Sequence, residues 1–350
     1  MAGSRTQAGP EDMQFKLGTF SAAAGAPFPG LVLDAPPAAQ RVVALSLLEP
    51  LLRHLNLRLR NAGSILSLLA HWDENLAALT QLCEATAPIE MAQGSVALDG
   101  LRTHAPIDPP RQIFCTIANY RSHIIESVLD AGVPPHTDGM DAEGRRGYAA
   151  KMLDERLRGA PYACFKLPTT VIGPNDALEI PRQAQRVDWE LELGVVIGRP
   201  ARRVARSDAM DYVAGYVLVN DITARDLVRR TDVANMGTDW LQSKNAPGFL
   251  PLGPYLVPAA FVPNPYDLCL TLCLNDQPMQ NSLVSDMLFD IATQIEYLSH
   301  QAQLLPGDVI CTGTPAGCGT HYKRYLQPGD VIHATAPGLG TQRTPCIAEV

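Results

Sequence analysis

Three acidic residues at alternate positions are the strongest candidates for chemistry in this sequence. In the segment VDWELELGVVIG, Asp188, Glu190 and Glu192 would share one face of a strand, because side chains alternate between faces. A half-buried strand with a solvated acidic face is the simpler explanation. However, glutamate is unfavourable in strands, and the run continues into apolar residues. Neighbouring carboxylates repel unless a cation lies between them, so the alternative is a site for Mg²⁺, Mn²⁺ or Ca²⁺.

Another acidic residue lies where a second predicted strand ends. The segment YVLVNDITARDL passes from apolar residues into Asn220 and Asp221, and Arg225 follows. Asp and Asn often cap helices, which is the structural explanation. In the functional alternative, Asp221 is a third oxygen ligand at the rim of the sheet. Arg225 would then present a positive charge to a substrate oxygen.

A histidine and a glutamate three residues apart could form a general base. His123 and Glu126 occur in IANYRSHIIES and would be neighbours on one helical turn. The carboxylate could then fix the tautomer of the imidazole and raise its basicity, which suits the deprotonation of water. His-x-x-Glu is common by chance, so this pair alone favours a structural explanation.

Two lysines and a glycine-rich turn could supply positive charge and hydrogen-bond donors. Lys166 in CFKLP and Lys244 in WLQSKNAPGF stand among apolar and turn residues. Most such lysines extend to the surface, but either could hold a carboxylate or a developing oxyanion. In CTGTPAGCG, Thr314 and the nearby backbone N–H groups could bind a substrate carboxylate. This turn is not a P-loop, because no G-K-[ST] follows.

Short strands must position most of these residues. From Ile113 onward, apolar runs alternate with Pro, Gly, Asp and Asn, which predicts a β-rich body of an α+β protein. Apolar residues at helical spacing from Met287 to Leu298, closed by Pro306, predict one helix within it. The polar and partly helical segment 127–162 is interpreted as an insertion over this body, close to the His-x-x-Glu pair.

The N-terminal part predicts a smaller unit. Residues 1–12 are small and polar and are expected to be a disordered extension. Residues 13–106 are expected to form a small α+β module: QFKLGTF and FPGLVLD predict strands, and a helix follows Ser64 and ends before Pro88. Residues 107–350 would then form the larger catalytic domain.

Composition excludes several classes of function. The chain has 350 residues, 46% of them hydrophobic, and a formal net charge of −8. This composition is globular, and its acidic balance argues against nucleic-acid binding. The apolar runs are too short to span a membrane, and the N-terminus does not resemble a secretory signal. Eight cysteines without a C-x-x-C pair are expected to be reduced thiols in a cytoplasmic protein.

Several motifs occur here in a fixed order. They are N-Y-x-x-H-x-x-E, F-K-x-P, D-x-E-x-E-L, G-Y-x-x-x-N-D-x-x-A-R-D, a lysine before P-L-G-P, and G-T-P-A-G. Over roughly residues 113–350 the sequence therefore resembles the fumarylacetoacetate hydrolase family, and within it the acylpyruvate hydrolase-like members of bacterial type. The resemblance implies a mixed β-roll catalytic domain, rich in β-structure, that usually forms a homodimer.

The resemblance also implies a metal centre and a base. The family holds Mg²⁺, Mn²⁺ or Ca²⁺ through two glutamates on one strand and one aspartate, which correspond to Glu190, Glu192 and Asp221. Its His–Glu dyad on a mobile lid segment corresponds to His123 and Glu126.

The remaining candidates are carried over in the same way. The active-site lysine and arginine of the family correspond to Lys244 and Arg225, while Lys166 and Thr314 correspond to substrate-binding positions. One position departs from the pattern. Some hydrolase members have a glutamine three residues after this arginine, where it contributes to an oxyanion hole, but Val228 stands there in this sequence.

We therefore expect a metal-dependent hydrolase that cleaves a C–C bond in a 2,4-dioxo acid. Acylpyruvates such as fumarylpyruvate or maleylpyruvate would give pyruvate and a carboxylic acid, as in the catabolism of aromatic compounds. Val228 leaves open an alternative on the same fold, a decarboxylase or isomerase of a 2-oxo dicarboxylic acid. A binding protein without catalytic activity is a third hypothesis, although every group that catalysis needs is present.

Overall fold

A computed structural model describes residues 15–33, 40–86, 91, 93–130 and 139–350. The extension expected over residues 1–12 lies outside these ranges, as does a part of the segment 127–162. None of the helices in the described ranges combines the length and the apolar character needed to cross a membrane.

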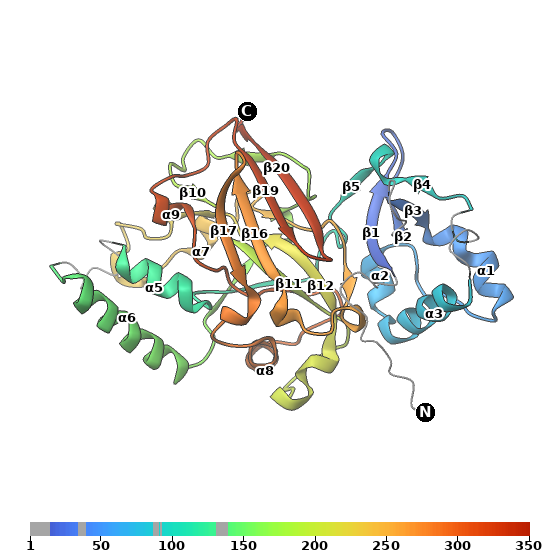
Figure 1. Ribbon diagram of the computed structural model, residues 1–350, viewed down its shortest axis with the longest axis horizontal. Helices are drawn as coiled ribbons and strands as arrows, with labels where there is room; N and C mark the ends of the chain where they lie inside the picture. Colours follow the sequence, from blue (N-terminus) through green and yellow to red (C-terminus); the bar gives the residue numbers. More distant parts are fainter. Residues whose placement is uncertain (1–14, 34–39, 87–90, 92, 131–138) are drawn as a thin grey trace, which may run out of the picture.

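The N-terminal module is an antiparallel sheet with helices beside it (Figure 1). Its strands lie in the order β4-β3-β2-β1-β5. They are β1 (Lys16–Ser21), β2 (Phe28–Leu33), β3 (Arg41–Ala44), β4 (Val96–Ala97) and β5 (Arg102–His104). The helices are α1 (Glu49–His54), α2 (Ile65–Leu69) and α3 (Trp72–Ala85).

The single helix expected after Ser64 is divided into α2 and α3. Ser64 caps α2 as expected, because its hydroxyl accepts a hydrogen bond from the Ser67 backbone N–H at 3.0 Å. The Leu68 carbonyl then accepts from the Asn75 side chain at 2.8 Å and from the His71 N–H at 3.1 Å. These bonds end α2 and start α3 in a new direction, which apolar spacing alone does not reveal.

A six-stranded sheet forms the centre of the body, in the order β15-β12-β11-β18-β6-β7. Its strands are β6 (Ile113–Thr116), β7 (Ala163–Lys166), β11 (Leu191–Ile197), β12 (Val213–Asn220), β15 (Val257–Pro258) and β18 (Val309–Cys311). The long β11 and β12 are antiparallel, with Leu191 opposite Asn220. This register brings the start of β11 to the end of β12, where the candidate acidic residues lie.

A second sheet packs against the central one, in the order β17-β16-β19-β20-β9 (Figure 1). Its strands are β9 (Leu178–Ile180), β16 (Cys269–Leu274), β17 (Gln277–Leu283), β19 (Val331–Ala336) and β20 (Gly340–Ala348). Two short pairs complete the body, β10 (Val187–Asp188) with β13 (Thr223–Ala224), and β8 (Val171–Ile172) with β14 (Leu250–Pro251). The β-rich α+β class expected from the sequence is confirmed.

The helices of the body are α5 (Arg121–Leu129), α6 (Ala142–Leu157), α7 (Trp240–Lys244), α8 (Ile291–Gln301) and α9 (Gly319–Tyr322). The helix expected from Met287 begins later, at Ile291. Asp290 caps it by accepting from the Thr293 N–H at 2.8 Å. Met287 and Leu288 instead lie in the preceding loop beside α5, with the Leu288 N–H donating to the Asn119 carbonyl.

Two apolar cores cover the two faces of the central sheet. One contains Leu191, Leu193 and Val195 of β11, the inner face of the second sheet and α8. The other lies between the N-terminal module and the opposite face, where Val196 meets residues such as Leu17 and Trp72. This second core belongs to both units, so each covers apolar surface of the other.

Removal of residues 1–106 should therefore destabilise the rest of the chain. A protein of residues 107–350 would expose the face of the central sheet that the N-terminal module covers, which favours aggregation. We expect loss of cooperative unfolding in a thermal melt, and aggregation in size-exclusion chromatography. A truncated protein that unfolds cooperatively at the melting temperature of the full chain would contradict a shared core.

Candidate active site

Three carboxylates meet where β11 starts and β12 ends. One carboxylate oxygen from each of Glu190, Glu192 and Asp221 lies within 4.8 Å of the other two. The backbone fixes this arrangement, because the Asp221 N–H donates to the Glu190 carbonyl at 2.8 Å and the Asn220 side chain accepts from the Glu190 N–H at 2.9 Å. All three side chains are buried. A solvated acidic face, the simpler explanation of the sequence pattern, is therefore wrong.

Lys244 places an ammonium group against two of these carboxylates. It ends α7, whose first turn is capped by Asp239. Its Nζ lies 3.0 Å from Glu190 Oε2, 2.5 Å from Asp221 Oδ2 and 2.8 Å from Thr223 Oγ1. The structure therefore brings this predicted residue to the acidic cluster.

Lys166 lies beneath the cluster and not at its open side. Its Nζ donates to the backbone carbonyls of Ile222, Lys244 and Phe249 at 2.6–2.9 Å, and lies 3.0 Å from Asp221 Oδ1. The side chain is fully buried. These oxygens surround the ammonium group within the described part of the chain, and the substrate-binding role expected for Lys166 stays a prediction. Its role is to position Asp221 and the backbone that carries Lys244.

The charges of the buried cluster do not balance. The pKa of Asp221 is held at about 2, because Lys244 and Lys166 outweigh the effect of burial. Burial also acts on Glu190, but Arg225 and Lys244 lower its pKa. Burial and the two neighbouring carboxylates raise the pKa of Glu192 well above its ordinary value. Of the three carboxyl groups, Glu192 therefore most favours its protonated form when no cation is bound.

The donor set fits a hard divalent cation. Three buried carboxylates that face one another provide the oxygen ligands that Mg²⁺, Mn²⁺ and Ca²⁺ prefer. A cation here would also offset the repulsion between Glu192 and the carboxylates of Glu190 and Asp221. The Glu192 carboxylate is already oriented by a hydrogen bond from the Gly313 N–H at 2.7 Å.

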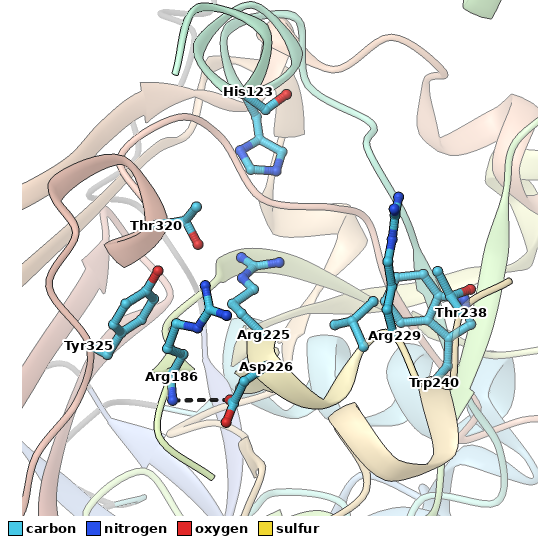
Figure 2. A pocket seen from close by; sticks show the side chains of 11 residues that line it. His123, Arg186, Arg225, Asp226, Arg229, Thr238, Trp240, Thr320 and Tyr325 are labelled. Carbon is cyan, nitrogen blue, oxygen red and sulfur yellow. Dashed lines mark hydrogen bonds between the residues drawn. The ribbon is translucent and has the colours of Figure 1, made fainter. Parts of the chain in front are cut away.

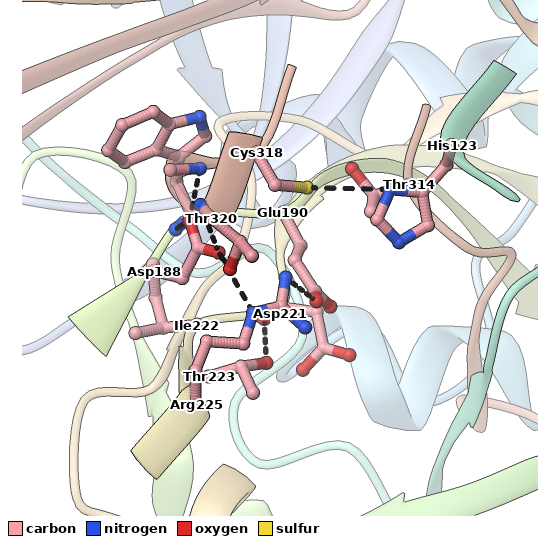
Figure 3. Close-up of polar contacts among 12 residues, drawn as sticks. His123, Asp188, Glu190, Asp221, Ile222, Thr223, Arg225, Thr314, Cys318 and Thr320 are labelled. Carbon is pink, nitrogen blue, oxygen red and sulfur yellow. Dashed lines mark hydrogen bonds and ion pairs between the residues drawn. The ribbon is translucent and has the colours of Figure 1, made fainter. Parts of the chain in front are cut away.

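Arg225 carries a fixed positive charge beside the carboxylates (Figure 3). Its Nε lies 2.8 Å from Asp188 Oδ2, and its Nη2 lies 2.5 Å from Glu190 Oε1. Asp188 also accepts hydrogen bonds from the Gly319 N–H at 2.6 Å and the Thr320 hydroxyl at 3.0 Å. Asp188 therefore orients Arg225. Its alternate spacing with Glu190 and Glu192 would equally fit a metal ligand, so the sequence pattern alone does not reveal this role.

His123 and Glu126 share one turn of α5, but they do not form the expected dyad. Glu126 accepts from the Gly317 N–H at 2.9 Å and lies 3.6 Å from Nδ1 of His321. His123 Nδ1 lies 4.0 Å from Cys318 Sγ (Figure 3). Both residues are described, and no hydrogen bond joins their side chains. Gly317 is required here, because its φ is +95° and a Cβ would overlap the Met279 carbonyl.

The surroundings of His123 favour its neutral form. Desolvation lowers its pKa first, and the positive charge of Arg225 lowers it further, against the opposing effects of Glu190 and Asp188. Figure 2 shows the ring pointing from α5 into a cavity, toward Arg225. A neutral imidazole in this place can accept a proton from a bound molecule.

Polar residues that the sequence analysis did not identify hold α5 in place. Asp286 accepts from the Ser122 N–H at 2.9 Å and from its hydroxyl at 2.6 Å. Asn119, fully buried before α5, donates to the Phe289 and Thr312 carbonyls at 3.0 and 2.8 Å. The motif N-Y-x-x-H-x-x-E contains Asn119, but sequence spacing gives no signal for Asp286.

Helix α6, within the segment 127–162, lies along α5 (Figure 1). Leu153 of α6 packs with Ile124 of α5 and with Phe289. Arg156 lies over the Phe289 ring, 5.0 Å from its centroid, and its Nη2 donates to the Ile117 carbonyl at 3.3 Å. The described part of this segment therefore supports the helix that carries His123.

Thr314 lies in the turn expected from the sequence, where two contacts occupy its hydroxyl. It donates to the Leu191 carbonyl at 3.0 Å and accepts from Gln280 Nε2 at 2.9 Å. Gln280 is buried, and its Oε1 accepts from the Leu191 N–H at 3.0 Å. Gln280 therefore joins β17, β11 and the turn, a role that its sequence context does not indicate. A contact from Thr314 to substrate stays a prediction.

A cavity of about 590 Å³ opens beside these groups (Figure 2). It is lined by His123, Ser127, Arg186, Arg225, Asp226, Val228, Arg229, Thr238, Trp240, Thr320 and Tyr325. Three of its lining residues are arginines and one is an aspartate. Val228 contributes no hydrogen-bond donor, so the side chain at the position of the family's glutamine cannot stabilise an oxyanion.

Replacement of Lys166 tests its supporting role. Lys166→Met should lower the free energy of unfolding by about 3–5 kcal/mol, because it leaves Asp221 and three carbonyls without their buried cation. Chemical denaturation at neutral pH measures this change. The control is Lys151→Met on the exposed side of α6, where loss of a surface pair with Glu155 should cost at most about 1 kcal/mol. Equal effects of the two substitutions would contradict the assignment.

This chain is similar to known proteins over most of its length. The C-terminal domain of fumarylacetoacetate (FAA) hydrolase matches residues 112–347. An oxaloacetate tautomerase of Bacillus subtilis is 34% identical over 285 residues, which cover 80% of this chain and 85% of that protein. A 2,4-didehydro-3-deoxy-L-rhamnonate hydrolase of Sphingomonas is 40% identical over 186 residues, 52% of this chain and 64% of that protein.

Solved structures share the fold. A fumarylacetoacetate hydrolase from Exiguobacterium antarcticum has a TM-score of 0.69 and 26% identity, over 96% of this chain and 100% of that one. A probable 2-hydroxyhepta-2,4-diene-1,7-dioate isomerase from Mycobacterium abscessus has a TM-score of 0.67 and 29% identity, over 96% and 99%. The motifs, the fold and the family match over two thirds of the chain lead to one conclusion: this chain belongs to the fumarylacetoacetate hydrolase family.

Proposed function

We propose that the chain is a metal-dependent enzyme that interconverts the enol and keto forms of a small 2-oxo dicarboxylic acid such as oxaloacetate. The position of His123 carries the proposal, because its neutral ring faces the cavity beside Arg225 and the acidic cluster. No side-chain oxyanion donor is present at Val228. The similarity to an oxaloacetate tautomerase over most of the chain supports this choice over the hydrolase favoured by the sequence.

Glu190, Glu192 and Asp221 would hold Mg²⁺ or Mn²⁺. When bound, such an ion supplies a Lewis acid for the oxygens of the substrate's 1-carboxylate and 2-oxo group. Lys244 and Arg225 add fixed positive charge on the same side. The protein therefore favours negative charge on these oxygens, which is the charge of an enolate.

His123 would move the proton. It accepts the proton of the enol hydroxyl as this O–H bond breaks, and then gives a proton to C3 as the new C–H bond forms. No atom enters or leaves, so the reaction needs neither an activated water nor a separate oxyanion hole. Because no water has to be activated, the reaction does not need a hydrogen bond between His123 and Glu126.

Hydrolysis of an acylpyruvate is the second candidate function. His123 and Glu126 lie on one turn of α5, so a change in the contact between Glu126 and Gly317 would free the carboxylate to approach the ring. The similarity to a rhamnonate-type hydrolase also supports it. The homodimer expected from the resemblance stays a prediction for either reaction.

Product analysis distinguishes the two reactions. We expect the protein with Mn²⁺ to accelerate the decay of enol-oxaloacetate, followed by its ultraviolet absorbance, and EDTA to abolish the acceleration. The product mass should be unchanged, whereas decarboxylation would release CO₂. If the protein does not accelerate enol decay but releases pyruvate and an acid from fumarylpyruvate or maleylpyruvate, the hydrolase replaces our proposal.

The pH dependence tests the role of His123. Its lowered pKa means that the neutral ring persists below the ordinary histidine value of 6.5, so kcat/KM should start to fall only below that pH. His123→Asn should reduce kcat/KM about 10²–10⁴-fold and remove this acid limb. His300→Asn, an exposed histidine on α8, is the control and should change neither. An unaltered profile in His123→Asn would exclude this ring as the base.

A further inference from the structure

The wall of the cavity holds two cationic side chains that the proposed proton transfer does not use. Arg186 and Arg229 both line the cavity and are exposed. Within the described residues, neither guanidinium has a hydrogen-bond or ion-pair partner. Arg225 differs, because Asp188 and Glu190 occupy it. The two exposed arginines therefore face the cavity with their charge uncompensated.

The backbone around these arginines is built as one unit. The Asp226 carboxylate accepts from the Gln185 N–H at 2.9 Å and the Arg186 N–H at 3.0 Å. The Arg225 N–H in turn donates to the Arg186 carbonyl at 2.8 Å. Asp226 is the only carboxylate among the lining residues, and it is oriented toward backbone N–H groups (Figure 2). It therefore anchors the loops without pairing with either guanidinium.

Arg186 lies directly before β10, which pairs with β13 just ahead of Arg225. Figure 2 shows its side chain pointing toward Arg225. Arg229 lies on the other side of Arg225 in the same view, near Trp240. Arg225 lines the cavity and pairs with Glu190, so the basic wall of the cavity adjoins the acidic cluster.

We propose that Arg186 and Arg229 form the site for the second carboxylate of a 2-oxo dicarboxylic acid. The inference rests on the proposed function, which places the 2-oxo acid end of the substrate at Glu190, Glu192 and Asp221. The distal carboxylate then extends along the cavity to the free guanidinium groups. Tyr325, which lines the same wall and whose hydroxyl has no hydrogen-bond partner among the described residues, adds a neutral donor beside Arg186. Charge-assisted hydrogen bonds of this kind select dicarboxylates over monocarboxylates of equal length.

Binding measurements without turnover test this site. The probes are 2-oxoglutarate and 2-oxopentanoate, which share a five-carbon chain and differ in the second carboxylate. Isothermal titration of the full chain with Mn²⁺ should give a Kd at least tenfold lower for 2-oxoglutarate. Arg186→Gln and Arg229→Gln should each reduce this preference, and the double variant should abolish it while the Kd for 2-oxopentanoate stays unchanged. The preference should also decrease as salt is added, because the site is exposed.

The matched control is Arg343→Gln on β20, another exposed arginine whose guanidinium has no partner among the described residues and which does not line the cavity. It should keep the full preference for 2-oxoglutarate. Equal affinity of the unchanged protein for both probes, or a preference that survives in the double variant, would overturn the assignment. Failure of the proposed function looks different, because the preference for 2-oxoglutarate would remain while the protein left the decay of enol-oxaloacetate unaccelerated.

Discussion

The burial of unequal numbers of opposite charges is the constraint on which this active site depends. Four buried carboxylates, Asp188, Glu190, Glu192 and Asp221, face the cations of Lys166, Lys244 and Arg225. Each cation has carboxylate partners at 2.5–3.0 Å, so removal of one would leave a buried charge without compensation. Within the described residues Glu192 has no cationic side chain at ion-pair distance, and a divalent cation at the cluster would favour its ionised form. Metal affinity and the stability of the fold are thus linked through the same side chains.

The sheet topology makes this burial possible. The register of β11 and β12 brings Glu190 beside Asp221, and backbone hydrogen bonds fix both before any side chain is considered. Lys166 at the end of β7 then joins the loop after β12 to the end of α7. Three segments that are distant in sequence meet at one ammonium group. The candidate catalytic groups are therefore held at the ends of β7, β12 and α7, while α5 carries His123.

Sequence analysis predicted the family, the β-rich class and the residues that meet at the acidic cluster. Alternation within D-x-E-x-E-L was sufficient because it depends only on the strand period. The role of Lys166 could not be predicted in this way, since a lysine in F-K-x-P has the same local pattern whether it faces substrate or three carbonyls. The same limit applies to Glu126, whose partner is the Gly317 amide from a distant turn. Gln280 and Asp286 act through contacts over more than 80 residues of chain, which local spacing does not encode.

Helix α6 restricts the movement of α5, the helix that carries His123. Because Leu153 and Arg156 pack against α5 and Phe289, α5 cannot move away from the cavity without separating these contacts or carrying α6 with it. The position of α5 is thereby coupled to a helix that contributes no residue to the wall of the cavity. A substitution on α6 that shifted α5 would therefore displace His123 without changing any residue of the cavity wall.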